Sequence, residues 1–392
     1  MFGVGLHFSF RDLWRVRDIA VPGALAQTFL ATLLGIGLTR LWDWPIAAGI
    51  VTGLALSVAS TVVLLRGLMD TSLLNTTHGQ AAVGWLVMED LMTVLILVLM
   101  PALAPTEGSL ALSHLGLTLL KAAAFVALVG FVGRRVIPWL LDRIAHTRSR
   151  ELFILAILAI ALGTALGAAE LFGVSLALGA FVAGAVVSES PLSHQVGADV
   201  LPFREAFAVL FFVSVGMLVN PAYLWQNIGP VLALTALIMI GKPLIVLLLG
   251  LFFSRSAFTM LVIAAGLSQI GEFSFILGQA GLSLNLLRPE HYSLILAGAL
   301  LSIMLNPLMF RLVNPMHAAL QRLPWLWRRL DRHDTPPPPA DPGLSNHLVI
   351  VGYGQVGQQI VQVARSLQIP HLVIESDVER VEQLNAAGTE TL

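Results

Sequence analysis

Long apolar stretches are the feature that most constrains how this chain can fold. Ten of them are close to the roughly 20 residues that an α-helix needs to cross a bilayer. They are expected near residues 19–39, 45–65, 81–101, 111–132, 151–168, 173–188, 204–219, 227–252, 256–280 and 292–313. Only 11% of the residues are charged, whereas soluble domains carry about 25%. The sequence therefore predicts a polytopic α-helical membrane protein.

Basic residues alternate between the two sets of loops that connect these spans. One set holds most of them, namely Arg11, Arg15, Arg17, Arg66, Arg134, Arg135, Arg143, Arg148, Arg150, Arg204 and Arg255. The opposite set holds only Arg40 and Arg288. Because basic residues are enriched in cytoplasmic loops, the first set is predicted to be cytoplasmic. The soluble C-terminal part follows the tenth span on that same side.

The two ends of the sequence differ from the apolar middle. A ten-residue apolar stub begins the chain; it is too short to cross a bilayer, and we expect it to be the end of a span. We divide the chain into a transmembrane domain at 1–318, a proline-rich linker at 319–345 and a partial Rossmann-like domain at 346–392. The absence of cysteine excludes disulfides, thiolate metal sites and cysteine nucleophiles.

Glu89, Asp90 and Lys242 are charged residues flanked on both sides by apolar sequence within predicted spans. Glu89 and Asp90 are adjacent in GWLVMEDLMTVLILVLM, and Lys242 lies in ALIMIGKPLIVLLLGLF. Ionisable groups at that depth are costly and usually functional. We expect Glu89 to pair with Lys242, which leaves Asp90 free to bind a monovalent cation or a proton. The alternative is a static buried ion pair that only fixes helix packing.

Two spans are predicted to be interrupted near the middle of the membrane. The second span carries Ser60 and Thr61, and the ninth carries Gln269 and Glu272 among glycines. Small and hydroxyl residues permit local unwinding, and unwound helices in two halves of a transporter are typical of its ion site. Close packing of helices through small residues is the alternative explanation.

A nucleotide-binding motif follows the linker. Gly352, Gly354 and Gly357 have G-x-G-x-x-G spacing between a predicted strand and a predicted helix, and Glu375 ends the next strand. The glycines allow the backbone to approach a pyrophosphate, and the acid binds a ribose hydroxyl. NAD(H) or an adenosine nucleotide is therefore the expected ligand. The alternative is a Rossmann-type unit that retains its glycines for packing alone.

Several segments resemble the Kef-type monovalent cation/proton antiporters, the cation:proton antiporter-2 family. These segments are MFGVGLHFS, ALSVASTVVLLR, GWLVMEDL, GRRVIPW, SRELFILA, LALGAFVAG, FAVLFFVSVGML, SQIGEFSFIL, LSIMLNP and HLVIVGYGQVG. The resemblance covers essentially the whole chain in order. It implies a sodium/proton-exchanger-like inverted-repeat fold with two crossed broken helices, followed by the start of a cytoplasmic Rossmann-like regulatory domain.

The resemblance also implies roles for individual residues. Asp90 becomes the carboxylate that exchanges ion for proton, with Ser60, Thr61, Gln269 and Glu272 on the crossing helices. Lys242 falls on the neighbouring helix, and Gly352, Gly354, Gly357 and Glu375 hold the nucleotide. Many family members have Gln where this chain has Glu89, so their stoichiometry does not carry over. Two full spans and most of a third are expected before Met1, and the rest of the regulatory domain is expected after Leu392.

The favoured interpretation is a secondary transporter that exchanges K+, or else Na+, for H+ and is regulated by a nucleotide. It is expected to lie in the bacterial cytoplasmic membrane as a multi-pass homodimer surrounded by lipid, with no nucleic-acid partner and no cofactor for transport. One alternative is a nucleotide-gated, channel-like K+ efflux pathway. Another is a membrane-bound NAD-dependent oxidoreductase, although the sequence carries no quinone, flavin or haem signature.

Overall fold

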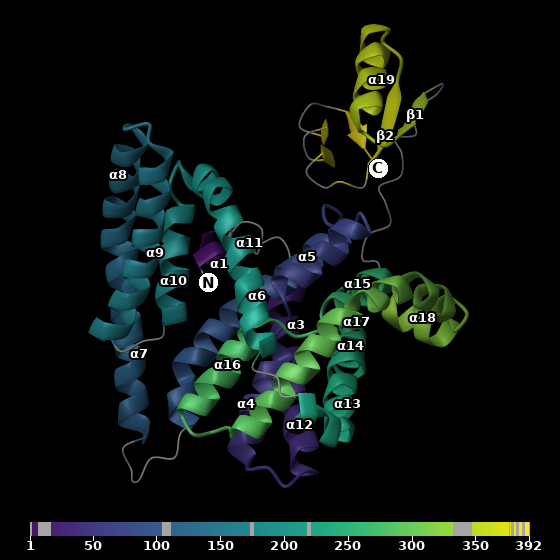
Figure 1. Ribbon diagram of the computed structural model, residues 1–392. Helices are drawn as coiled ribbons and strands as arrows, with labels where there is room; N and C mark the ends of the chain where they lie inside the picture. The colour runs from purple at the N-terminus through teal and green to yellow at the C-terminus, as the bar shows by residue number, and fades with distance from the viewer. Residues whose placement is uncertain are drawn as a thin grey trace.

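The computed structural model describes residues 2–6, 17–103, 111–172, 176–217, 221–331, 347–375, 377, 380–381, 384–385 and 389–391. Of the described residues, those up to Leu330 are mostly helical, and a small α/β unit follows near the C-terminus (Figure 1). The first helices are α1 (Phe2–Leu6), α3 (Arg17–Arg40), α4 (Ile46–Ser57), α5 (Thr61–Asp70), α6 (Thr77–Leu99), α7 (Ala111–Leu128), α8 (Arg134–Ala145) and α9 (Arg150–Phe172). The remainder are α10 (Leu176–Ser188), α11 (Ser193–Met217), α12 (Pro221–Gln226), α13 (Ile228–Ala236), α14 (Lys242–Gly250), α15 (Ala257–Gly266), α16 (Glu272–Ser283), α17 (Pro289–Gln321) and α18 (Pro324–Leu330).

These helices confirm the prediction of a polytopic helical membrane protein. Within the described residues, seven helical stretches are long and apolar enough to cross a membrane. The predicted spans at 173–188 and 256–280 contain apolar helices that are shorter than a full span. The predicted span at 204–219 lies within the longer helix α11.

One helix runs beyond its predicted end at residue 132. The helix α7 continues through a π-helical turn, Val129–Gly133, directly into α8. This continuation is amphipathic, because Ile137 and Leu141 are buried while Arg134 is exposed and pairs with Glu189. The arginines at 134 and 135 therefore lie within a helix and not in a connecting loop.

Two of the predicted spans are each split into two half-helices. Residues 58–60 separate α4 from α5, and residues 267–271 separate α15 from α16. The half-helices pack in an alternating way, α4 against α16 and α5 against α15. This is the arrangement expected when two interrupted segments run in opposite directions and cross at their breaks.

The helices form two groups, which Figure 1 shows side by side. In the first group, α3 and α6 flank the broken helices, and α17 packs against α15. Helices α3 and α4 approach closely, because a Cβ at Gly35 would lie 2.4 Å from the Cα of Gly53. In the second group, α10 packs against α9 and α1, and α8 packs against α9. The first group holds the two large apolar cores.

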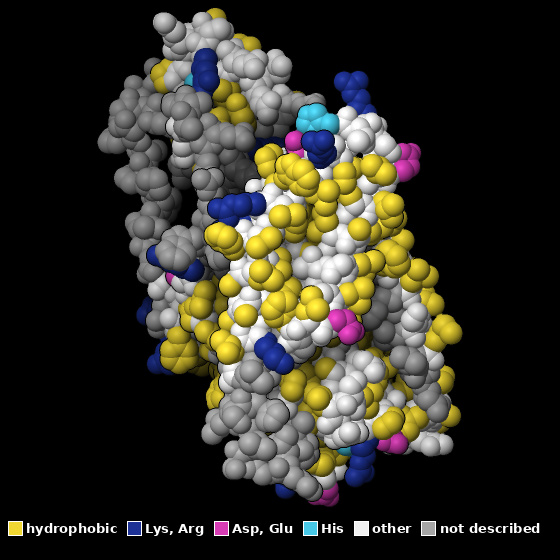
Figure 2. Space-filling model, turned by 90° about the vertical axis from the view of Figure 1, so that its left-hand side faces the viewer, with side chains coloured by type: hydrophobic (Ala, Val, Ile, Leu, Met, Phe, Trp, Pro, Cys, Tyr) yellow, Lys and Arg dark blue, Asp and Glu magenta, His cyan; other side chains and the backbone are white. Residues whose placement is uncertain are grey.

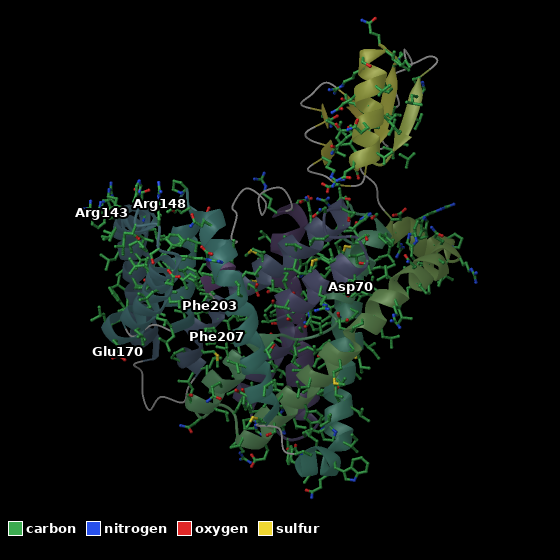
Figure 3. All side chains as sticks on the ribbon, turned by 45° about the horizontal axis from the view of Figure 1, so that its top comes forward. Asp70, Arg143, Arg148, Glu170, Phe203 and Phe207 are labelled. Carbon is green, nitrogen blue, oxygen red and sulfur yellow. The ribbon has the colours of Figure 1, made fainter. Side chains whose placement is uncertain are left out.

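The surface of the second group is suited to lipid. Leu120, Phe131, Leu155 and Leu162 are each more than 60% exposed, and Figure 2 shows hydrophobic side chains spread over this face. Arg143 and Arg148 lie at the upper end of this group in Figure 3, whereas Glu170 lies lower, near the other end of α9. Charged residues thus mark the ends of these helices and leave a largely apolar band between them.

Among the residues described, the C-terminal unit contains a small parallel sheet with a helix between its first two strands. Strands β1 (Leu348–Val351), β2 (His371–Ile374) and β3 (Glu390–Thr391) pair in the order β1-β2-β3, and α19 (Gln355–Ser366) connects the first two. In the first pair, Leu348 is opposite His371. A parallel pair joined by a helix is the βαβ arrangement of nucleotide-binding folds.

Candidate functional site

The two helix breaks lie directly against each other in the interior of the first group. The Ser60 backbone N–H donates to Gln269 Oε1 at 3.0 Å, and Gln269 Nε2 donates back to the Ser60 carbonyl at 3.2 Å. The Gly271 N–H donates to the Val58 carbonyl at 3.3 Å. A side chain at residue 271 has no room, because a Cβ there would lie 2.6 Å from the Ser60 Cα. The Ser60 and Gly271 N–H groups, one at each break, therefore find their acceptors across the crossing.

Glu89 and Asp90 lie beside this crossing on the long helix α6. Both side chains are 1% exposed. Glu89 Oε2 accepts a hydrogen bond from the Ala59 N–H at 3.1 Å, and Asp90 Oδ2 accepts one from Thr61 Oγ1 at 3.0 Å. The second oxygen of each, Glu89 Oε1 and Asp90 Oδ1, is buried and has no hydrogen-bond partner within the described residues. Two unpartnered carboxylate oxygens beside one helix crossing are a suitable donor set for a desolvated monovalent cation.

Lys242 reaches the same crossing from α14 but does not form the direct ion pair that the sequence led us to expect. Its side chain is 2% exposed, and its Nζ donates to the Gln269 carbonyl at 3.0 Å. No Lys242–Glu89 contact within 4.0 Å is found in the described part of the chain. The two charges still attract each other through space. The ammonium is held at the break because a freed carbonyl there offers a closer partner than the carboxylate.

Ser60 and Glu272 occupy the ends of two half-helices at the crossing. Ser60 is the N-cap of α5, and its Oγ accepts from the Val63 N–H at 3.4 Å. Glu272 is the first residue of α16, where a helix N-terminus favours negative charge. Its side chain is half-buried, and no hydrogen bond or ion pair to it is found among the residues described. The structure brings Ser60, Thr61 and Gln269 into the hydrogen-bond network and leaves Glu272 beside it.

The structure adds residues that the sequence interpretation missed. Gln27 on α3 is fully buried, and its Nε2 donates to the Ser57 carbonyl at 3.1 Å, at the last residue of α4. Its Oε1 has no partner within the described residues. Asn306 on α17 donates to the Ala265 carbonyl at 2.8 Å, near the end of α15. A lone amide within an apolar run, as in ALAQTFL, was the signal available for Gln27.

A second candidate site lies at the glycine turn of the C-terminal unit. Gly352 has φ of +92°, a backbone conformation that favours glycine. Gly357 is required for packing, because a Cβ there would lie 2.1 Å from the Gly352 carbonyl oxygen. Gly354 is different: nothing lies within 4 Å of its Cβ position, and it is the N-cap of α19. An open glycine at a helix N-terminus leaves room for a phosphate to approach the backbone N–H groups.

Glu375 is placed at this turn by the end of β2. Its Oε2 accepts from the Tyr353 N–H at 2.5 Å, and its Oε1 accepts from the Asp377 N–H at 3.0 Å. A ribose hydroxyl that donates to this carboxylate would therefore meet the Tyr353 and Asp377 N–H groups there. The glycines and the acid are thus adjacent in space and fit a dinucleotide or an adenosine nucleotide.

Comparison with known proteins gives a consistent result for both parts of the chain. Residues 1–313 match the sodium/hydrogen exchanger transmembrane family, and residues 348–392 match the TrkA-N domain. The chain is 49% identical over 394 residues to the putative cation/proton antiporter YbaL of Escherichia coli (strain K12), covering 99% of this chain and 70% of that protein.

More distant relatives have related names. The putative K(+) efflux antiporter KefB of Alkalimonas amylolytica is 30% identical over 394 residues, which cover 99% of this chain and 58% of that protein. The K(+) efflux antiporter 4 of Arabidopsis thaliana is 34% identical over 316 residues, which cover 80% of this chain and 53% of that protein. The chain therefore spans between about half and 70% of the length of these three relatives.

Proposed function

The chain belongs to the sodium/hydrogen exchanger family, and we propose that it exchanges a monovalent cation, K+ in preference to Na+, for H+ across the bacterial cytoplasmic membrane. One observation carries the proposal: Asp90 is buried beside the contact between two helix breaks and has one carboxylate oxygen without a partner. Relatives named as cation/proton and K(+) efflux antiporters support the transported ions. A carboxylate oxygen at membrane depth that lacks a protein partner is available to bind a transported cation or proton.

Exchange follows from competition at Asp90. Thr61 holds Oδ2 in place, and Oδ1 binds either the cation or the proton. Protonation removes the negative charge that attracts the cation, so the two ligands exclude each other. We take the site to change the side of the membrane that it faces only while it holds either the cation or the proton. Under that condition, movement of the cation in one direction drives movement of protons in the other.

Glu89 and Lys242, which neighbour Asp90, are held in fixed positions around the proposed ion site. Glu89 is anchored to the Ala59 N–H, and Lys242 is anchored to the Gln269 carbonyl. A fixed positive charge close to Glu89 partly offsets the negative charge of the paired carboxylates. The backbone carbonyls at the two breaks, together with Gln27 Oε1, supply further oxygen ligands for a cation that has lost its water.

The alternatives raised by the sequence are less well supported. The relatives are named as antiporters, which favours exchange over a nucleotide-gated channel. They are transporters and not enzymes, which disfavours the NAD-dependent oxidoreductase. We retain the division into a transmembrane domain at 1–318, a linker at 319–345 and a regulatory part at 346–392, and we propose a homodimer.

The C-terminal unit is proposed to regulate exchange by binding NAD(H) or an adenosine nucleotide. Support comes from the match to the TrkA-N domain and from the adjacent glycine turn and acid. The backbone N–H groups at Gly354 and the start of α19 are assigned to the phosphates, and Glu375 is assigned to the ribose hydroxyls.

The test of exchange uses Asp90→Asn in everted membrane vesicles. A cation pulse should release protons from wild-type vesicles, measured as recovery of a pH-sensitive dye, with K+ and Na+ added separately. Asparagine keeps the shape of the side chain but cannot bind a proton, so coupled exchange should fall to the vesicle background. Asp142→Asn is the matched control, because that aspartate is 67% exposed on α8. Exchange that persists in Asp90→Asn would refute the assignment of Asp90.

A further inference from the structure

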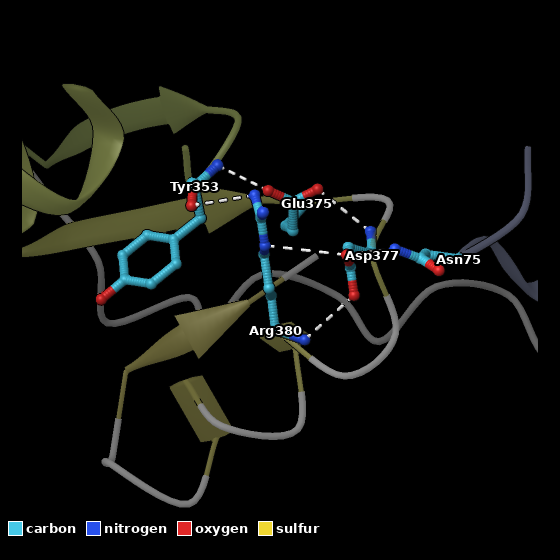
Figure 4. Close-up of polar contacts among 5 residues, drawn as sticks. All are labelled: Asn75, Tyr353, Glu375, Asp377 and Arg380. Atoms are coloured by element: carbon cyan, nitrogen blue, oxygen red, sulfur yellow. Dashed lines mark hydrogen bonds and ion pairs between the residues drawn. The ribbon is translucent and has the colours of Figure 1, made fainter. Parts of the chain in front are cut away.

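A polar contact joins the C-terminal unit to the turn at residues 71–76, between α5 and α6 (Figure 4). Asn75 Nδ2 donates to Asp377 Oδ2 at 3.1 Å. Asn75 immediately precedes Thr76, the N-cap of α6, whose Oγ1 accepts from the Gly79 N–H at 3.2 Å. The contact therefore reaches the end of a long helix and not a free loop.

The helices on both sides of this turn carry the ion site. Helix α5 begins at Thr61 and α6 contains Asp90, and these two side chains are hydrogen-bonded to each other. At 1.5 Å per residue, the turn lies about 15 Å from Thr61 and about 20 Å from Asp90. Both helices are continuous over these distances, so a displacement of the turn would reach Thr61 through α5 and Asp90 through α6. These two residues are the partners of one hydrogen bond.

On the other side of the contact, Asp377 belongs to the nucleotide site. Its backbone N–H donates to Glu375 Oε1 at 3.0 Å, and its Oδ2 lies 3.6 Å from Arg380 Nε. Arg380 Nη1 also donates to the Tyr353 carbonyl at 3.3 Å, within the glycine turn (Figure 4). Asp377 is thus tied both to the acid assigned to the ribose and to the turn that closes on the phosphates.

The space between the two parts is large enough for ligand atoms. A pocket of about 360 Å³ is lined by Ser72, Asn75 and Thr76 on one side and by Glu375, Asp377 and Arg380 on the other. Small-molecule sites commonly have about 300–1,000 Å³. A ribose held by Glu375 would therefore lie at the boundary between the C-terminal unit and the membrane part.

We propose that a ribose-containing nucleotide controls the ion site through the Asp377–Asn75 contact, an inference that rests on the proposed function. A ribose hydroxyl that donates to Glu375 competes with the Asp377 N–H for that carboxylate. Asp377 then shifts, its hydrogen bond to Asn75 is altered, and the turn moves α5 and α6 with it. The nucleotide thereby biases the relative position of Thr61 and Asp90 without touching either.

The first test exchanges the partners of the contact in the full chain. Asn75→Asp places two carboxylates opposite each other, whereas Asn75→Asp with Asp377→Asn restores one donor and one acceptor in reversed positions. We measure cation/proton exchange in vesicles with and without NADH and, separately, AMP, and nucleotide binding by equilibrium dialysis. The response of the wild type should be about fivefold or more. It should be lost in the single variant and recovered in the reversed pair, with the nucleotide supplied at a concentration that the dialysis shows to saturate each protein.

Asn227→Asp is the matched control, because the Asn227 side chain donates locally to the Tyr223 carbonyl at 2.9 Å. Asn227 directly follows α12, a helix at the end of the molecule opposite the C-terminal unit (Figure 1). This variant should respond to the nucleotide as the wild type does. A full response in Asn75→Asp, or no recovery in the reversed pair, would overturn the proposed route.

A second readout does not depend on transport. The chain contains no cysteine, so Asn75→Cys with Asp377→Cys provides the only thiols for a short bis-maleimide cross-linker. The rate of cross-linking, followed by mass spectrometry of the digested protein, should change about fivefold or more when NADH or AMP binds. An unchanged rate would refute the inference even if the protein exchanges cations. A changed rate without any exchange would instead refute the proposed function alone.

Discussion

The contact between the two helix breaks makes a sharp prediction at Gly271. The backbone of Gly271 has φ of −112° and ψ of −169°, a region that alanine adopts without strain. Any effect of Gly271→Ala therefore comes from the added methyl group and not from the backbone. That methyl carbon would lie 2.6 Å from the Ser60 Cα, 2.9 Å from the Ser60 N and 3.0 Å from the Ala59 carbonyl oxygen.

The magnitude of the effect follows from these distances. Ordinary contact begins near 3.4 Å, so Ser60 must retreat by about 0.8 Å from its 2.6 Å position. The two Ser60–Gln269 hydrogen bonds, at 3.0 and 3.2 Å, would then lengthen beyond useful range. Overpacking and the loss of buried hydrogen bonds each cost about 1–3 kcal/mol, so we expect a total loss of stability of about 2–6 kcal/mol.

The assay is thermal unfolding in detergent, followed by fluorescence of the eight tryptophans, together with exchange in vesicles. Gly37→Ala is the matched control, because nothing lies within 4 Å of its Cβ position in α3. Alanine in a helix interior is favoured over glycine by about 0.5–1 kcal/mol, so this control should be neutral or slightly stabilised. Gly271→Ala with the Tm and exchange of the wild type would show that the breaks are not in contact as described.

Two further substitutions test neighbouring residues. Lys242→Met removes the donor to the buried Gln269 carbonyl, so we expect a loss of about 1–3 kcal/mol in the same unfolding assay, and an unchanged Tm would contradict the anchoring role. Gln27→Leu removes the Oε1 that is proposed as a cation ligand, so the KM for K+ should rise about tenfold, equivalent to about 1.4 kcal/mol, while the maximal rate is retained. An unchanged KM would assign Gln27 to packing at the end of α4.

The membrane helices and the two breaks could be predicted because their signals are local. Apolar runs of sufficient length have few alternatives to a helix in lipid. Serine and glycine in mid-span, at Ser60 and Gly271, indicated where the helices would open. The glycine turn and the position of Glu375 could likewise be predicted, because the spacing of these residues is typical of a strand–turn–helix unit.

The partners across the site could not be predicted, because they depend on how distant helices pack. The sequence suggested that Lys242 pairs with Glu89, but the break in α15–α16 exposes the Gln269 carbonyl, which is nearer to Nζ. Gln27 carried no pattern beyond being a lone polar residue. The extension of α7 into α8 was missed because the charged residues Arg134 and Arg135 were assigned to a loop. The apolar residues Ile137 and Leu141 nevertheless continue a helical face.

The hydrogen bonds at the crossing also determine which parts of the molecule can slide. Ser60, Gln269, Asp90 and Lys242 link α5, the α15–α16 break, α6 and α14 into one bonded body. The boundary between α6 and the second group of helices is instead a cluster of apolar side chains, Val94, Val98, Phe125, Ala168, Leu178 and Val182. Apolar contacts have no preferred direction, so this boundary can shear without breaking a hydrogen bond within the cluster. The carboxylates are therefore best suited to move together with these hydrogen-bonded helices, as one rigid body that slides along the apolar boundary with the second group.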